Sequence, residues 1–258
     1  MLEKQRHQLI IDLVEQARFA SVSHLSNELS TSEATIRRDI NKLFELQKLK
    51  KIRGGAESIA SGKEPTQRAL SASSFETNHE MHSDKKRRIA EKAVEICQEG
   101  EPIIVNGGTT TFMMGEFLVK RSVSILTNSF KLAHYIGKHG ENQVTLPGGE
   151  LYREQGIVLS SFEQDTIQYY HSSKMFMGTQ GITRVGVTES DPLLIRAEQK
   201  MRKQADQLIV LADSSKIGQR GNFIFCLPEE VDILITDDEA DPKLLQELRE
   251  FGIEVIIS

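Results

Sequence analysis

Seven short runs rich in β-forming residues alternate with segments of helical periodicity from residue 103 onward. The runs are residues 103–105, 124–126, 144–146, 174–177, 208–211, 233–236 and 254–257. Such alternation favours a mostly parallel sheet, because each helix carries the chain back to the edge where the next strand begins. This part of the chain is therefore predicted to be an α/β domain, in which ligands bind where strands end and helices begin.

The first 60 residues follow a different pattern, in which three helical segments precede a short hairpin. Apolar residues recur at helical spacing in each segment, and Ser21 and Ser32 stand where the second and third helices need an N-cap. Residues 49–59 form two extended runs around Gly54 and Gly55, which is typical of a hairpin. Three helices followed by a hairpin predict a winged helix-turn-helix domain.

Residues 61–83 are polar and irregular, with scattered serine, glycine and proline and no sustained apolar period. We interpret them as a linker. The predicted organisation is a winged helix-turn-helix domain at residues 1–60, a linker at 61–83 and an α/β domain at 84–258.

The net charge of −5 is distributed unevenly along the chain. Residues 1–60 contain ten Lys or Arg and eight Asp or Glu, a balance of +2, whereas the remaining residues have a balance of −7. An acidic protein as a whole is a poor partner for nucleic acid, but a local basic unit can still bind it. The charge pattern thus directs any DNA contact to the first unit.

The third helical segment presents one face to a core and the opposite face to solvent. At about 100° per residue, Ile36 and Ile40 share one side, and Arg38 and Asn41 lie roughly opposite. Arg pairs bidentately with guanine and Asn with adenine, while basic residues of the wing suit phosphates. The alternative is a small helical bundle that binds another protein. A salt-dependent mobility shift of DNA on adding the protein would exclude this alternative. The predicted DNA-binding residues are Ser32, Thr35, Arg37, Arg38, Asn41, Lys42, Lys51 and Arg53.

A loop of glycine and threonine at residues 106–111 follows the first strand and precedes a helical run. Its backbone amides and hydroxyls suit a phosphate ester, although ordinary turn and capping chemistry is the competing interpretation. Loops after other strands should gather at the same edge, where Lys216 supplies a charge for phosphate and Asp213 an acceptor for sugar hydroxyls. The predicted effector-binding residues are Asn106, Gly108, Thr109, Thr110, Thr111, Thr127, Asn128, Gly148, Gly149, Glu150, Asp213 and Lys216.

The chain resembles the DeoR family of bacterial transcriptional regulators. The family pattern S-x-x-T-[IV]-R-R-D-[IL] is matched by Ser32, Thr35, Ile36, Arg37, Arg38, Asp39 and Ile40, and its Gly-Gly-Ala wing by residues 54–56. The similarity continues at residues 108–110, 147–149 and 213–216. It implies a repressor of a carbohydrate operon that binds double-stranded operator DNA and a phosphorylated sugar or sugar acid. On this resemblance, residues 1–60 are the DNA-binding domain and residues 84–258 the effector-binding sensor domain. It also implies a homo-oligomer, either a dimer or a tetramer.

The second half also resembles the sugar-phosphate isomerase fold shared with ribose-5-phosphate isomerase, which implies a ligand class. Those enzymes need an acidic loop for proton transfer, whereas no carboxylate occurs in residues 166–188 of this chain. We therefore predict no catalytic residues and a binding domain in place of an enzyme. The alternative is a sugar-phosphate isomerase fused to a DNA-binding module, which an assay on phosphorylated pentoses and hexoses would test.

Cysteine, histidine and apolar runs give no further site. Cys97 and Cys226 lie in apolar runs and the seven histidines are scattered, so neither a metal site nor a cofactor is predicted. No run approaches the ~18 consecutive apolar residues of a membrane helix, and charged residues interrupt the first 16 residues. We expect a cytoplasmic protein with no membrane partner.

Overall fold

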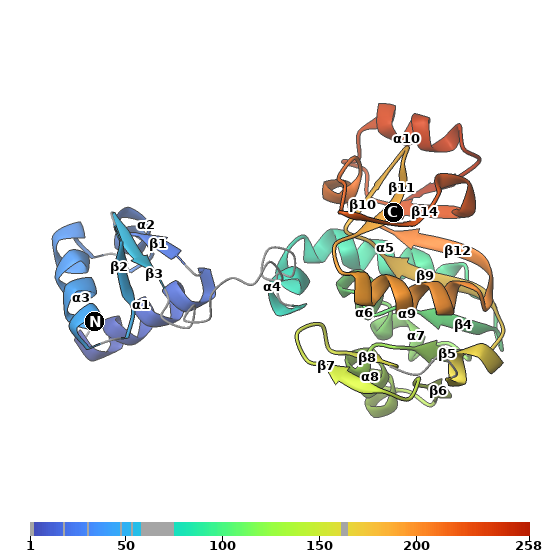
Figure 1. Cartoon of the computed structure of the whole chain (residues 1–258), viewed down its shortest axis with the longest axis horizontal. Coiled ribbons are helices and arrows are strands. Elements are labelled where there is room, and N and C mark those ends of the chain that lie inside the picture. The colour runs from blue at the N-terminus through green and yellow to red at the C-terminus, as the bar shows by residue number, and fades with distance from the viewer. Residues whose placement is uncertain are drawn as a thin grey trace. The chain divides into compact units, whose positions relative to one another are not determined.

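The computed structural model describes residues 3–17, 19–29, 31–46, 48–52, 54–57, 75–160 and 165–258. The chain divides into two compact units, residues 1–70 and 71–258 (Figure 1).

The described part of the first unit contains three helices and a three-stranded antiparallel sheet in the order β1-β3-β2. Its elements are α1 (Glu3–Ala17), β1 (Phe19–Ser21), α2 (Val22–Glu28), α3 (Glu33–Glu45), β2 (Lys50–Ile52) and β3 (Gly55–Glu57). Both predicted N-caps are confirmed, because Ser21 Oγ accepts from the N–H of His24 at 3.1 Å and Ser32 Oγ from that of Thr35 at 3.3 Å. All three helices contribute buried apolar side chains to one core.

The wing has a strand that was not predicted, because β1 is only three residues long and has no apolar alternation of its own. It pairs with β3 and places Ala20 opposite Ala56. This pairing gives the two glycines separate roles. Gly54 has a φ of +86°, which suits glycine, and a Cβ at Gly55 would overlap the carbonyl oxygen of Ala20.

The second unit is built on a seven-stranded parallel sheet in the order β15-β14-β12-β9-β4-β5-β6. Its strands are β4 (Pro102–Val105), β5 (Ser124–Thr127), β6 (Val144–Thr145), β9 (Ser172–Gly178), β12 (Ala205–Leu211), β14 (Ile233–Thr236) and β15 (Glu254–Ile257). These strands correspond to the seven predicted runs, so the predicted α/β class is confirmed. The strand order reverses between β4 and β9, which is where ligands of such sheets bind.

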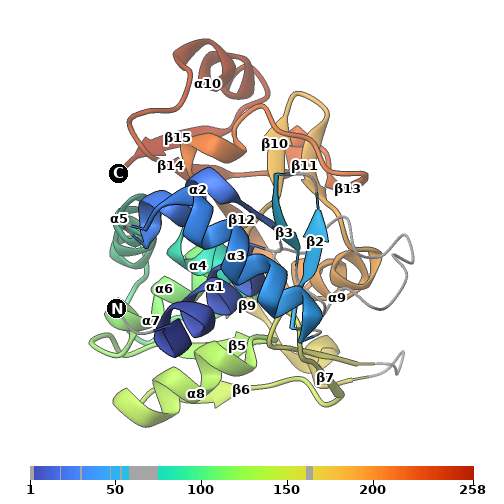
Figure 2. The same ribbon diagram turned by 90° about the vertical axis from the view of Figure 1, so that its left-hand side faces the viewer.

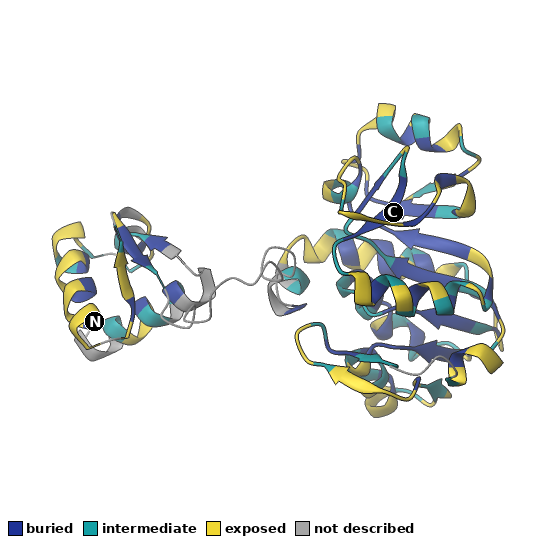
Figure 3. Ribbon diagram, in the orientation of Figure 1, coloured by how far each residue is buried: buried dark blue, intermediate teal, exposed yellow. Residues whose placement is uncertain are grey.

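Helices cover both faces of this sheet, as Figure 2 shows for α5 and α9 on opposite sides. The helices are α4 (Phe75–Glu80), α5 (Ser83–Glu95), α6 (Thr109–Met113), α7 (Gly115–Leu118), α8 (Phe130–His139), α9 (Pro192–Arg202) and α10 (Pro242–Arg249). Successive strand residues alternate between two cores, since Ile103 and Val105 pack towards α5–α8 and Ile104 packs with α9 and α10. The sheet is buried between these layers (Figure 3).

Two small antiparallel sheets were not predicted. One joins β7 (Glu150–Tyr152) to β8 (Ile157–Leu159), and the other has the order β10-β11-β13, with β10 (Gly181–Thr183), β11 (Gly186–Glu189) and β13 (Phe223–Cys226). Their strands have three or four residues, which is too short for a period-2 pattern to stand out from the surrounding turns.

The end of the predicted linker is wrong, because helix α4 occupies residues that we expected to be irregular. Phe75 is buried and packs edge-on against Phe112, with ring centroids 5.5 Å apart. A single aromatic residue in a polar segment gives no periodic signal, but its burial is enough to order this short helix on the second unit. Residues 61–74 of the predicted linker lie outside the described residues.

Candidate functional site

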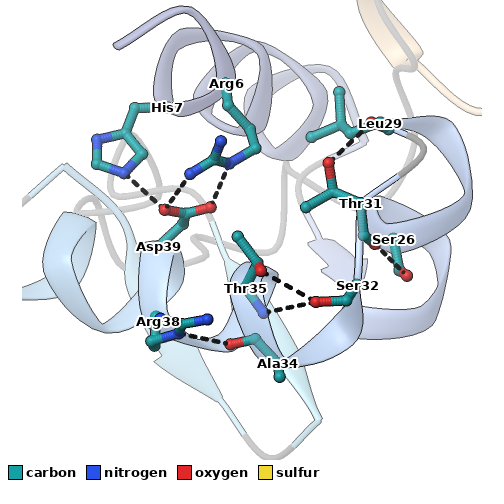
Figure 4. A network of polar contacts seen from close by, with 10 residues as sticks. All are labelled: Arg6, His7, Ser26, Leu29, Thr31, Ser32, Ala34, Thr35, Arg38 and Asp39. Carbon is teal, nitrogen blue, oxygen red and sulfur yellow. Dashed lines mark hydrogen bonds and ion pairs between the residues drawn. The ribbon is translucent and has the colours of Figure 1, made fainter. Parts of the chain in front are cut away.

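The predicted DNA-contacting side of α3 is exposed. Arg38, Asn41 and Lys42 are exposed, whereas Ile36 and Ile40 on the opposite side are buried. The hydroxyls of Ser32 and Thr35, by contrast, lie 2.9 Å apart and are engaged in capping the first turn (Figure 4).

Arg37 and Arg38 of α3 make only weak described contacts with residues one helical turn earlier. Arg37 Nη2 lies 3.1 Å from Glu33 Oε2, with 64% of the arginine side chain exposed, and Arg38 Nε donates to the carbonyl of Ala34 at 3.4 Å. Exposed pairs of this kind contribute little to stability, so both guanidiniums can be redirected to another acceptor at small cost. On the wing, Lys51 of β2 is exposed, and Arg53 lies outside the described residues.

Asp39 is the one acidic residue on the buried side of α3. Its carboxylate accepts from Arg6 Nε at 2.6 Å and Arg6 Nη2 at 3.1 Å, and it lies 3.0 Å from His7 Nε2 (Figure 4). Burial opposes ionisation of Asp39, but the bonds and charges of Arg6 and His7 outweigh it and hold its pKa below the ordinary value. The contact fixes α3 against α1. Sequence reasoning assigned Asp39 no role, although its position between Ile36 and Ile40 on the apolar face was a usable signal.

A cavity in the second unit lies at the carboxyl ends of β4, β9 and β12, next to the point where the strand order reverses. Six of the predicted effector-binding residues line it: Asn106, Gly108, Thr109, Thr110, Asp213 and Lys216. Residues that sequence reasoning missed also line it, among them Phe75, Asn78, Lys86, Gly107, Gln155, Gly178, Thr179, Gln180, Glu189 and Glu198.

The glycine and threonine loop after β4 is held by its own polar groups. Thr111 Oγ1 donates to the carbonyls of Asn106 at 2.9 Å and Gly108 at 3.1 Å, and the N–H of Gly107 donates to Asn128 Oδ1 at 2.8 Å. Thr111 and Asn128 therefore support the loop and do not line the cavity. Thr109 and Thr110 are the loop hydroxyl residues that do.

The loop after β12 contains a short 3₁₀ turn, η3 (Ser214–Lys216), capped by Asp213. Asp213 accepts from the N–H of Ser215 at 3.0 Å and from its hydroxyl, so capping chemistry is present here. A second contact ties the turn to the start of α5, where Lys85 Nζ donates to Ser214 Oγ at 2.9 Å and lies 3.3 Å from Asp237.

Two lysines, Lys86 and Lys216, bring positive charge to the cavity. Lys86 is 4% exposed, and its ammonium donates to the backbone carbonyl of Asn78. Burial lowers the pKa of Lys86, a shift that the charge of Asp213 opposes and that of Lys216 reinforces. An anion bound in the cavity would offset the electrostatic repulsion between these two lysines.

Two buried carboxyl groups also reach the cavity, Glu189 at the end of β11 and Glu198 on α9. Residues 166–188 contain no carboxylate, but the strands β10 and β11 turn back and bring Glu189 to the cavity directly after that interval. Glu198 reaches the cavity from the helix that follows. Sequence reasoning assigned neither residue to the site. Glu198 shares the inward side of α9 with Leu194 and Met201, which is a helical spacing visible in the sequence.

The remaining predicted residues lie away from this cavity. Thr127 is fully buried, and its hydroxyl accepts from the N–H of Ser129 at 3.0 Å. Gly148 and Gly149 precede the β7–β8 hairpin, and Glu150 lines a different cavity together with Asn128. The four loops follow parallel strands and therefore end at the same edge of the sheet, as expected. They do not all line one cavity, because β6 lies two strands from β4, at the end of the strand order.

Within the described residues, no cluster of three metal-binding side chains is present. No described helix is both long enough and apolar enough to span a bilayer.

Comparisons with known proteins agree for both units. Residues 6–62 match the DeoR-like helix-turn-helix domain, and residues 81–238 match the DeoR C-terminal sensor domain. The chain is 36% identical over 256 residues to the HTH-type transcriptional regulator UlaR of Shigella dysenteriae serotype 1, covering 99% of both proteins. UlaR of Escherichia coli (strain K12 / DH10B) matches with the same identity and coverage.

Among solved structures, the ribose 5-phosphate isomerase A of Methanocaldococcus jannaschii aligns with a TM-score of 0.39 and 17% identity, over 52% of this chain and 54% of that one.

Proposed function

The chain belongs to the DeoR family of transcriptional regulators, and from this premise we propose that it represses a carbohydrate-utilisation operon. In this proposal the first unit binds operator DNA. Binding of a phosphorylated sugar in the cavity of the second unit then causes the protein to release the operator. The observation that carries the sensing part is the cavity itself, where Lys86 and Lys216 lie with the loop of Thr109 and Thr110. The names of the relatives describe regulators and give no support to the isomerase alternative.

The proposed DNA contact uses α3 as a recognition helix in the major groove. Arg38 and Asn41 reach base edges, and Lys51 of the wing contacts the phosphate backbone. The exposure of these side chains supports this assignment. We further propose that the protein acts as a homo-oligomer, because paired half-sites on DNA require two recognition helices related by symmetry.

In the proposed effector site, lysine side chains and loop hydroxyls bind the phosphate group of the ligand. The phosphate lies against Lys86 and Lys216 and accepts from the hydroxyls of Thr109 and Thr110, since charge-assisted bonds of this kind are the strongest available to it. Asp213 helps mainly by shaping the turn that carries Lys216, because its Oδ1 is already engaged by Ser215.

Release of DNA follows if the effector binds more tightly to the form of the protein that fits its operator poorly. The coupling is reciprocal, so operator DNA must in turn weaken effector binding by the same factor. The first experiment is a thermal-stability screen of the full chain against phosphorylated sugars and sugar acids, ascorbate 6-phosphate included. A ligand present at about 100 times its dissociation constant should raise the free energy of unfolding of the second unit by about 2.7 kcal/mol.

The second experiment compares operator release against effector concentration for the wild type, Lys216→Ala and a control, Lys243→Ala. Lys243 is exposed on α10 and does not line the cavity. Lys216→Ala should bind operator normally yet need far more effector for release, whereas Lys243→Ala should follow the wild type. Coincidence of all three curves would show that the effector does not use this cavity.

A further inference from the structure

Glu198 has a carboxyl oxygen with no partner among the described residues. Its side chain is buried and lines the cavity. Glu198 Oε1 accepts from Asn106 Nδ2 at 2.6 Å, and Asn106 is itself oriented because its Oδ1 accepts from the N–H of Gly178 at 3.1 Å. The carboxyl group is thus held by one oxygen, while Oε2 is left to a molecule that enters the cavity.

Glu189 adds a second buried carboxyl group to the same cavity, where its Oε1 accepts from the N–H of Gln180 at 3.2 Å. Burial raises the pKa of Glu189 to about 7. Burial and the charge of Glu189 together raise the pKa of Glu198 well above its ordinary value. Asp191 raises both pKa values further, and Lys216 is the cation that opposes the shift at Glu189.

We propose that Glu189 and Glu198 receive the hydroxyl-bearing end of the effector, and that they select a sugar or polyol phosphate with an uncharged second end over one that ends in a carboxylate. This inference deepens the proposed function and rests on it, because the phosphate is taken to lie against Lys86 and Lys216.

The chemistry of the two kinds of ligand differs in one respect. A hydroxyl can donate to a carboxylate and accept from a protonated carboxyl group, so it suits Glu198 and Glu189 in either protonation state. A ligand carboxylate can only accept, and it would bring another negative charge beside two buried acidic groups. We therefore expect two otherwise identical ligands to differ at least tenfold in affinity.

The test is isothermal titration calorimetry of the full chain with three probes: glucitol 6-phosphate, 6-phosphogluconate and inorganic phosphate. The first two share a phosphorylated six-carbon chain and differ at C1, which is a hydroxymethyl group in one and a carboxylate in the other. The wild type should bind glucitol 6-phosphate at least tenfold more tightly than 6-phosphogluconate. Inorganic phosphate, which lacks a second end, reports on the proposed phosphate-binding groups alone.

Glu189→Gln and Glu198→Gln should each narrow the affinity ratio to less than threefold, because an amide removes negative charge and offers a donor to the ligand carboxylate. Both substitutions conserve side-chain volume, and Glu198→Gln keeps an oxygen for Asn106. Glu229→Gln is the matched control, since Glu229 is exposed and outside the cavity, and it should leave all three affinities unchanged.

Equal affinities in the wild type, a preference for 6-phosphogluconate, or an unaltered ratio in both variants would overturn the inference. The variant Lys216→Ala separates this failure from that of the proposed function. If inorganic phosphate binding depends on Lys216 but the ratio is near one, only the carboxyl selection is wrong. If no probe binds, or if phosphate binding is indifferent to Lys216, the proposed phosphate site fails and this inference fails with it.

Discussion

Replacing Asp39 with asparagine tests whether the contact between α3 and α1 stabilises the first unit. The Asp39 side chain is 7% exposed and that of Arg6 is 15% exposed, so solvent screens the pair only weakly. Removing one partner of a buried pair costs about 3–5 kcal/mol, and asparagine retains one acceptor, so we expect a loss of about 3 kcal/mol. The first unit spans residues 1–70, and a unit of this size has a total stability of only roughly 4–10 kcal/mol. The substitution should therefore remove a large fraction of its stability.

The assay is urea unfolding of the full chain combined with operator binding and effector binding. Asp39→Asn should shift the unfolding of the first unit to lower urea and weaken operator binding, while effector binding stays at the wild-type level. Glu45→Gln, at the exposed end of α3, is the matched loss of a carboxylate and should leave all three measurements unchanged.

The contribution of Asp39 to the stability of the first unit should also depend on pH. The pKa of Asp39 is lowered in the folded chain, so its contribution is present above the ordinary value of 3.8 and is lost as the pH falls through the lower folded value. Wild-type stability and operator affinity retained in Asp39→Asn would refute the assignment of Asp39 as the residue that fixes α3.

Three further predictions concern other parts of the chain. Arg38→Ala should cost about 1–3 kcal/mol on operator DNA, whereas Lys51→Ala should weaken binding to all sequences and reduce the salt slope by about one, so wild-type binding by both would contradict the docking. Because the folded pKa of Glu189 rises from 4.5 to about 7, the wild type should lose up to about 3 kcal/mol of stability as the pH increases through this interval. Glu189→Gln should lack this loss of stability. The measurement is urea unfolding of both proteins at pH 5 and at pH 8, and a difference in unfolding free energy between them that is the same at both pH values would contradict the prediction. Gly55→Ala should destabilise the wing by about 1–3 kcal/mol in urea unfolding, because its Cβ would overlap β1, whereas Gly137→Ala in α8 meets no atom and should be neutral or stabilising. A neutral Gly55→Ala would mean that β1 does not limit this position.

The seven strands of the parallel sheet could be predicted because each is an apolar run between turns, and a buried parallel strand needs no finer pattern. The small sheets could not, because a strand such as β10 acquires its partners from a segment outside the local pattern. Phe75 shows the same limit at the end of the linker, since its burial depends on Phe112, which lies 37 positions later in the chain.

The site was predictable where chemistry follows a strand directly, as at Thr109, Thr110 and Lys216. It was missed where an ionisable residue lies on the apolar side of a helix. Lys86 and Glu198 both do so, on α5 and α9, among residues that are otherwise buried and mostly apolar. A charged residue at an inward position is costly unless it meets a partner or a ligand, so this pattern is a usable signal for such sites.

The place of α4 has a consequence for building chimeric regulators by exchanging sensor units. Phe75 and Asn78 form part of the cavity wall, and Phe75 also stacks on His79 with ring centroids 5.8 Å apart. A splice at residue 83, where the predicted linker ends, would transplant the second unit without this wall. A splice before residue 75 includes the wall, so the transplanted unit keeps the whole cavity whichever DNA-binding unit it is joined to.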